Sequence, residues 1–185
     1  RIYTHESNRA ILQQLLPEAV ISTYGEDVVE SAIGEGGVAD VGTEKPGSDG
    51  EKLSSLLAWA DVVCIGCGLG QDDMAKWLLE NVLLQCEAPC VVDADGLNLL
   101  SRDMGLLRKT KADVVLTPHM KEMSRMIRCP VAELKEHRLS KLREFVNQYP
   151  VVCALKDSRT VVAAARRQMF VNTAGNSGMA KAGSG

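Results

Sequence analysis

The C-terminal end of the chain has the composition of a phosphate-binding loop. Residues 175–185 read GNSGMAKAGSG, so that small residues surround a single lysine, Lys181. Glycine has no Cβ, and a run of small residues therefore lets successive backbone N–H groups turn toward one anion. A helix beginning at or just beyond Gly185 would add its unpaired N–H groups and its dipole to the same site. Because that helix is not in the sequence, we expect the chain to be part of a longer polypeptide.

A second glycine-rich segment follows an apolar run. Residues 66–72 read GCGLGQD and precede an amphipathic stretch. Their spacing departs from the G-x-G-x-x-G dinucleotide fingerprint. The segment is either a ligand-binding glycine turn or a plain tight turn from a strand into a helix.

Acidic side chains follow the next apolar run. Asp93 and Asp95 occupy alternate positions, which would place both carboxylates on the same side of a strand. At least one of them could meet a magnesium ion, a ribose or a phosphate-bound water. The alternative for Asp95 is that it caps the N-terminus of a helix.

His119 and Lys156 each follow another apolar run. Thr117 is expected to cap a helix with Pro118 at its first position, which places His119 in the first turn, where open α/β sheets bind ligands. A purely structural histidine is the alternative. The charge of Lys156, at the end of a buried strand, must be met by a phosphate or by Asp157. Together these groups predict a nucleotide-phosphate site with room for a second substrate.

The elements that position these groups follow from the hydrophobic pattern. Short apolar runs typical of strands alternate with stretches whose apolar residues recur at helical spacing, which predicts a doubly wound α/β fold with helices on both sides of a mostly parallel sheet. The predicted strands are residues 2–4, 19–23, 62–66, 91–95, 114–117 and 151–156, and the predicted helices are 48–60, 72–85 and 131–149. Residues 160–164 and 169–171 are expected to form a hairpin, and residues 34–50 a surface loop.

Composition limits the function classes. The chain has 185 residues, 45% of them hydrophobic, which suits one domain with a sizeable core. A net charge of -3 with scattered basic residues argues against nucleic-acid binding. No apolar run approaches the ~20 residues that a membrane span needs. The cysteines lie largely in apolar runs, as Cys64 and Cys153 do, and read as small buried hydrophobes in a reducing cytoplasm.

Taken in order, these motifs resemble the ADP- or ATP-dependent NAD(P)H-hydrate dehydratases of the ribokinase-like superfamily. The resemblance covers nearly the whole chain and rests on GCGLG, DADGLN, TPH, LK and NSGMAKAGSG, at residues 66–70, 93–98, 117–119, 155–156 and 176–185. It implies a three-layer α/β/α fold with a mostly parallel central sheet. It also implies that residues 1–185 form a single domain that is incomplete at both ends.

The resemblance implies a repair reaction, the dehydration of hydrated NADH or NADPH to the working cofactor. ADP or ATP, with Mg²⁺, would transfer a phosphoryl group to the hydroxyl and so make it a good leaving group. The catalytic Asp of the family would directly follow Gly185, so that these residues alone are expected to be inactive. The substrate would contact Gly68, Gly70 and His119, and Asp95 and Asn98 would organise metal or phosphate. The implied nucleotide-binding residues are Lys156, Asp157, Ser158, Arg159, Thr160, Asn176, Gly183, Ser184 and Gly185.

Two other functions fit the same residues. One is a ribokinase-like kinase that phosphorylates a vitamin alcohol and releases the phosphoester. The other is a nucleotide-binding segment without catalytic activity. The resemblance further leaves open a homo-oligomer and an NAD(P)H-hydrate epimerase that is either fused or separate, and it implies no nucleic-acid or membrane partner.

Overall fold

The computed structural model describes residues 1–25, 47–175 and 178. Its residues group into two compact units, 1–53 and 54–185, which we describe separately. Helix α2 (Gly47–Trp59) crosses the boundary between the units. In the part of the chain that the structure describes, no helix is both long and apolar enough to span a bilayer.

The first unit contains a parallel pair of strands joined through a helix. Strand β1 (Ile2–His5) leads through the 3-10 turn η1 (Glu6–Asn8) into α1 (Arg9–Leu15), and β2 (Ile21–Tyr24) returns beside β1 with Ile2 opposite Ile21. The rings of Tyr3 and His5 both pack edge-on against Tyr24.

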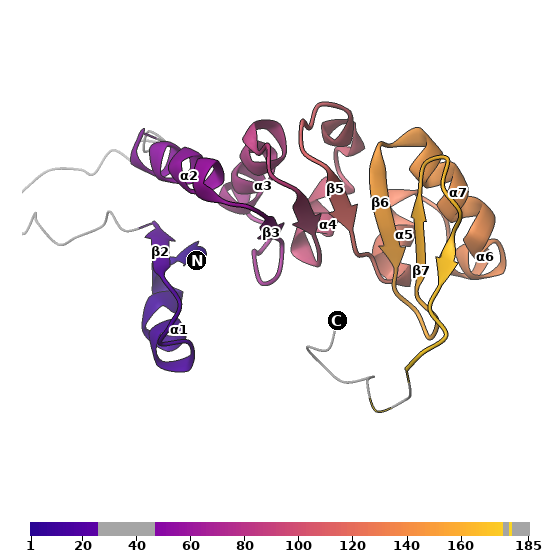
Figure 1. The fold of residues 1–185 in the computed structure, drawn as a ribbon, viewed down its shortest axis with the longest axis horizontal. Coiled ribbons are helices and arrows are strands. Elements are labelled where there is room, and N and C mark those ends of the chain that lie inside the picture. Colours follow the sequence, from indigo (N-terminus) through magenta and orange to yellow (C-terminus); the bar gives the residue numbers. More distant parts are fainter. Residues whose placement is uncertain (26–46, 176–177, 179–185) are drawn as a thin grey trace, which may run out of the picture. The chain divides into compact units, whose positions relative to one another are not determined.

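The second unit is built on a sheet in which every strand pairs with its neighbours in sequence order. Strands β3 to β6 are parallel, and β7 and β8 are antiparallel additions at one edge. The strands are β3 (Val63–Ile65), β4 (Cys90–Val92), β5 (Val114–Leu116), β6 (Val151–Leu155), β7 (Val161–Ala164) and β8 (Phe170–Val171) (Figure 1). The predicted mostly parallel sheet with a C-terminal hairpin is therefore confirmed.

The connections between the parallel strands are helical. They are α3 (Asp73–Gln85), α4 (Asp95–Leu100), the 3-10 helix η2 (Met104–Arg108), α5 (Met120–Met126), α6 (Val131–Glu136) and α7 (Arg138–Gln148). The single helix predicted over residues 131–149 is wrong. The chain breaks at His137, whose backbone leaves the helical region (φ -112°, ψ 29°), so that His137 ends α6 and precedes α7.

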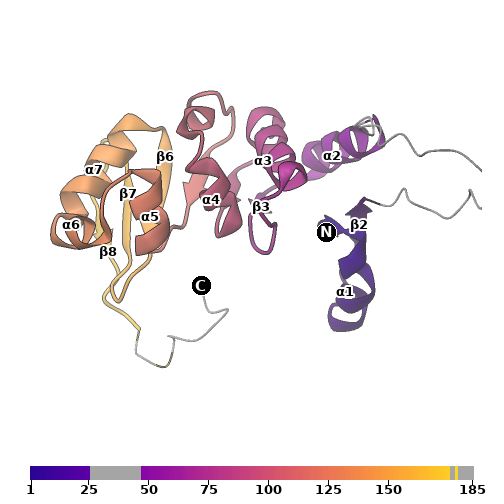
Figure 2. The same cartoon turned by 180° about the vertical axis from the view of Figure 1, so that it is seen from behind.

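The order of the strands explains which face of the sheet these helices cover. Right-handed crossovers that always step to the next strand in the same direction place every connecting helix on the same side. Figures 1 and 2 show α5, α6 and α7 together on one side of β6 and β7. Burial agrees, because in β4 to β7 the fully buried residues occupy alternate positions.

The residues that point to the other face form one row across the sheet. They are paired in register from strand to strand and are small and apolar, and among the described residues none is fully buried: Cys64, Val91, Val115, Val152 and Ala164. Cys64 is exposed, so its predicted burial is wrong, whereas Cys153 is fully buried as predicted. The difference is one of sheet face, because Cys64 belongs to the row that points away from the connecting helices, whereas Cys153 points to the opposite face.

The predicted strand positions are confirmed to within two residues at each end, except that β4 ends at Val92, three residues before the predicted end. Most of the surface loop predicted over residues 34–50 lies outside the described residues. Its last four residues, 47–50, belong instead to the first turn of α2.

Candidate functional site

The carboxyl ends of β4, β5 and β6 meet at one edge of the sheet, and an ion pair joins the outer two. The Lys156 Nζ lies 2.9 Å from the Asp93 Oδ1, and both side chains are largely buried. Lys156 follows the last residue of β6 directly, and Asp93 follows β4 in the same way. The partner of Lys156 within the described residues is thus Asp93 and not Asp157, which pairs with Arg138 at 3.2 Å.

The Asp93 carboxylate is held in its charged form. Partial burial raises its pKa, but the hydrogen bond from Lys156, the hydrogen bond from the backbone N–H of Ala94 and the charge of Lys156 outweigh this effect. The net result is a pKa below the ordinary value of an aspartate. A fixed negative charge therefore stands beside the lysine that the sequence assigns to a phosphate.

The loop after β5 is joined to the loop after β6. The backbone N–H of Lys156 donates to the Pro118 carbonyl at 2.7 Å, and His119 and Lys156 form a parallel β-bridge. These bonds extend the pairing of the two strands by a residue beyond their ends. They place His119 at the same edge of the sheet as Lys156.

His119 is itself the cap of helix α5. Its Nδ1 accepts hydrogen bonds from the N–H groups of Lys121 and Glu122, each at 3.1 Å, while Glu122 accepts one from the His119 N–H at 2.8 Å. The prediction that Thr117 caps this helix and that His119 lies in its first turn is wrong by two residues. The reciprocal bonds of the capping box decide the helix start in favour of His119.

The capping bonds also orient the imidazole. Because Nδ1 accepts, a neutral ring carries its proton on Nε2, which lies 3.3 Å from Glu122 Oε1. The histidine side chain is 50% exposed, whereas that of Glu122 is 7% exposed. Both ring nitrogens therefore contact groups of α5, and half of the imidazole surface is accessible at the strand ends.

The glycine turn after β3 has two different kinds of glycine. A Cβ on Gly66 would lie 1.9 Å from the Asp93 carbonyl oxygen and 2.7 Å from the Gly96 nitrogen, so only glycine fits there. Gly68 (φ 67°) and Gly70 (φ 81°) also have left-handed backbones, yet no atom lies within 4 Å of the Cβ position of either. The space above Gly68 and Gly70 is open, as a surface for close ligand approach requires.

Asp95 holds this turn in place. Its carboxylate accepts hydrogen bonds from the Gly70 N–H at 3.2 Å and from the Gln71 side chain at 3.4 Å. The prediction that Asp93 and Asp95 share one side of a strand is wrong, because β4 ends at Val92 and Ala94 takes a positive φ of 49°. Asp93 is hydrogen-bonded to Lys156, whereas Asp95 is hydrogen-bonded to the Gly70 N–H of the glycine turn.

Asn98 lies on helix α4 and its side-chain oxygen accepts a hydrogen bond from Arg125. Across the described residues, no three His, Cys, Asp or Glu side chains gather as a metal-binding group. A magnesium ion near Asp95 and Asn98 would therefore take most of its oxygen ligands from nucleotide phosphates and water, as Mg²⁺ commonly does.

The remaining predicted site residues fall into two groups. Asp157, Ser158, Arg159 and Thr160 form the connection between β6 and β7 at the same edge as Lys156, with the first three exposed. Asn176, Gly183, Ser184 and Gly185 lie outside the described residues. Sequence reasoning named Asp93 as one of two candidate carboxylates but did not foresee that it pairs with Lys156.

The fold is that of the ribokinase-like superfamily. A ribokinase-like protein from Enterococcus faecalis matches 98% of this chain with a TM-score of 0.73 and 25% identity, over 55% of its own length. The ADP/ATP-dependent NAD(P)H-hydrate dehydratase of Bacillus subtilis, co-crystallised with ATP/Mg²⁺, matches 97% of the chain with a TM-score of 0.71 and 26% identity, over 55% of its own length.

Within this fold, the chain belongs to the NAD(P)H-hydrate dehydratase family, whose pattern it matches over residues 4–185. It is 32% identical to the ADP-dependent (S)-NAD(P)H-hydrate dehydratase of Neisseria meningitidis over 94% of the chain and 53% of that relative. It is 40% identical to the bifunctional NAD(P)H-hydrate repair enzyme of Escherichia coli over 73% of the chain and 25% of that relative. The chain thus spans about a quarter to a half of the length of these relatives.

Proposed function

We propose that these residues belong to an enzyme that dehydrates hydrated NADH or NADPH at the expense of ADP or ATP. The observation that carries the proposal is the open glycine turn at Gly68 and Gly70, which ends at the same sheet edge as His119 and Lys156. Membership of the dehydratase family and the names of its relatives support it.

The substrate half of the site is the glycine turn with His119. An unobstructed backbone at Gly68 and Gly70 allows a flat ring and its ribose to lie against the main chain. The half-exposed imidazole of His119 then provides a ring surface for the substrate, in an orientation that the capping box has already selected. Both groups bind and orient, which is the main task of the protein in a phosphoryl transfer.

The nucleotide half extends from Lys156 to Thr160 and includes Asn176, Gly183, Ser184 and Gly185. The Asp93 carboxylate neutralises part of the charge of Lys156 and holds its ammonium group in place. A phosphate therefore binds to a positioned ammonium group and neutralises only the remaining charge. Nucleotide phosphates and Mg²⁺ would supply the transferable group and its charge compensation. The residue that acts on the reacting hydroxyl is the Asp expected after Gly185.

The wider setting of the activity is part of the proposal. Residues 1–185 would form one ribokinase-like domain that acts in the cytoplasm, in a single subunit or a homo-oligomer. The relatives named bifunctional repair enzymes support an epimerase that is fused to this domain or works beside it.

The test uses the full-length polypeptide that carries these residues, with hydrated NADH and either ADP or ATP. Recovery of the reduced-nicotinamide absorbance together with release of inorganic phosphate is the expected result. A stable phosphoester without recovery of absorbance would assign the protein to the small-molecule kinases. Nucleotide binding with neither product would leave a binding segment and would refute the proposed activity.

A further inference from the structure

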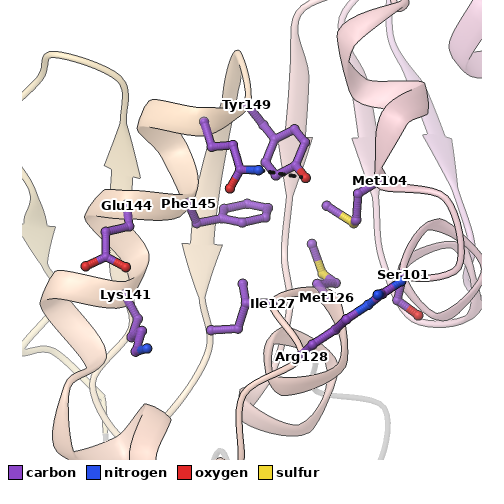
Figure 3. A pocket seen from close by; sticks show the side chains of 10 residues that line it. Ser101, Met104, Met126, Ile127, Arg128, Lys141, Glu144, Phe145 and Tyr149 are labelled. Carbon is purple, nitrogen blue, oxygen red and sulfur yellow. Dashed lines mark hydrogen bonds between the residues drawn. The ribbon is translucent and has the colours of Figure 1, made fainter.

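A cavity of about 330 Å³ lies away from the strand ends that carry the proposed site. Its walls come from the C-terminal ends of α4 and α5, the start of η2 and the last two turns of α7 (Figure 3). Helices α4 and α5 begin at the carboxyl ends of β4 and β5, and α7 leads into the amino end of β6. The cavity is therefore near the opposite edge of the sheet.

The lining of the cavity is mixed, and its apolar part comes from Phe145, Met104, Met126 and Ile127. Figure 3 shows the Phe145 ring directed into it, with Met104 and Met126 on the facing side. Phe145 and Met126 are almost fully buried and form the base. Methionine side chains adapt readily to a flat ring, and they make favourable contacts with aromatic groups.

One wall of the cavity carries the Arg128 side chain. Among the described residues, no hydrogen bond or ion pair engages the Arg128 guanidinium, which extends past Met126 toward Ser101 in Figure 3. The other cation at the cavity, Lys141, is already paired with Glu133 at 2.9 Å. Arg108 stacks over the Tyr149 ring at 5.4 Å and adds a further positive charge nearby.

The backbone of Arg128 is held in a conformation that favours glycine. Its φ is +51°, and it occupies the position after the C-cap of α5. There, the Arg128 N–H donates to the Arg125 carbonyl and the Cys129 N–H to the Ser124 carbonyl, which is the Schellman arrangement. Main-chain bonds thus complete the helix end, and the guanidinium is not needed as a cap. An arginine where glycine would relieve strain points to a use for its side chain.

The geometry points to a second ligand site, in which this cavity binds a small molecule that combines an aromatic ring with a carboxylate or phosphate. The ring lies against Phe145 between the two methionines, and the anion pairs with Arg128. The volume is within the range of small-molecule sites and suits a ligand of one ring. This site is independent of the proposed dehydratase activity.

The test uses phenyl phosphate as the probe and the methyl resonances of ¹³C-labelled methionine as the readout. Saturable shifts of Met104 and Met126, with Met74 unchanged, are the expected result. Benzyl alcohol, which has the ring without the anion, should bind at least about fivefold more weakly. If Met104 and Met126 do not respond to phenyl phosphate, the proposal is refuted.

A pair of substitutions separates the side chain from the strained backbone. Arg128→Gly should raise Tm by about 2 °C, since it relieves a left-handed residue, and weaken phenyl phosphate about tenfold. Arg166 is the matched control, because it is also exposed and has a φ of +56° but lies in the turn between β7 and β8. Arg166→Gly should raise Tm similarly and leave binding unchanged. Unaltered affinity in Arg128→Gly would overturn the assignment.

Discussion

The Asp93 carboxylate lies 2.9 Å from the Lys156 ammonium group, and this contact joins residues 63 positions apart in the sequence. The pair links the ends of β4 and β6 across the intervening β5. Because β5 contributes His119 to the same edge, the ion pair fixes the separation of the loops on either side of the histidine. The proposed substrate and nucleotide halves of the site share this contact.

Replacement of Asp93 should destabilise the protein. Asp93→Asn leaves a largely buried ammonium group without its counter-charge, and we expect a loss of about 1–2 kcal/mol in the free energy of unfolding. Asp157→Asn is the matched control, since the Arg138–Asp157 pair is more exposed on its acidic side and should contribute less than about 1 kcal/mol. Urea denaturation of both variants measures the difference. Equal losses would mean that the buried pair has no special role.

The contribution of Asp93 should depend on pH in a defined direction. Its pKa is lowered in the folded state from a reference value of 3.8, so that its stabilising effect is fully present above that value and is lost as the pH falls through the folded-state pKa. The stability difference between wild type and Asp93→Asn should therefore be constant near neutral pH and shrink below about pH 4. Denaturation curves over this range test it. A difference that grows on acidification would contradict the lowered pKa.

The two kinds of glycine in the turn after β3 should respond differently to alanine. Gly66→Ala places a methyl group 1.9 Å from the Asp93 carbonyl oxygen and should cost about 3 kcal/mol or prevent folding. Gly68→Ala meets no atom, so its cost should be limited to about 1–2 kcal/mol of backbone strain. In a binding assay, Gly68→Ala should nevertheless weaken hydrated NADH. Full substrate affinity in that folded variant would remove Gly68 from the site.

His119 has a capping role and a proposed binding role, which substitution can separate. His119→Asn retains a side chain that caps helices well, and we expect a stability change within about 0.5 kcal/mol, whereas His119→Ala should cost about 1 kcal/mol. Both variants should raise the KM for hydrated NADH about tenfold, because both lack the imidazole. If His119→Asn restores the wild-type KM, the residue acts only as a helix cap.

The cysteines should fall into two classes toward alkylation. Burial raises the pKa of Cys90 and of Cys153 to about 12, and both are fully buried, so neither should react with iodoacetamide in the folded protein. Cys67 is exposed and should react first. Mass spectrometry after brief labelling at about pH 8 identifies the modified positions. Rapid modification of Cys153 without unfolding would refute the buried assignment.

The positions of the strands could be predicted from the sequence, but the side-chain contacts at the carboxyl ends of the strands could not. Apolar runs located every strand from β3 to β6, because these strands are apolar on both faces of the sheet, including the face where no residue of the row is fully buried. The partner of Lys156 could not be read in this way. Asp157 is adjacent in sequence, but Asp93 becomes adjacent only once β4, β5 and β6 are paired in order.

The other differences between prediction and structure concern where helices begin and end. Thr117 followed by Pro118 is a common helix start, yet the His119–Glu122 bonds begin the helix two residues later. Between residues 131 and 149 the apolar spacing continues through Leu134 and Leu142, so that nothing in the pattern announces the break at His137. Such boundaries depend on tertiary packing, which periodicity does not record.

The close approach of Gly66 to Gly96 has a mechanical consequence. The Cα of Gly66 is 3.2 Å from the Cβ position of Gly96, so that the turns after β3 and β4 touch through bare main chain, with no side chain between them to absorb a shift. A displacement of either turn must be transmitted to the other. The two turns therefore form one rigid main-chain surface under any ligand that binds there.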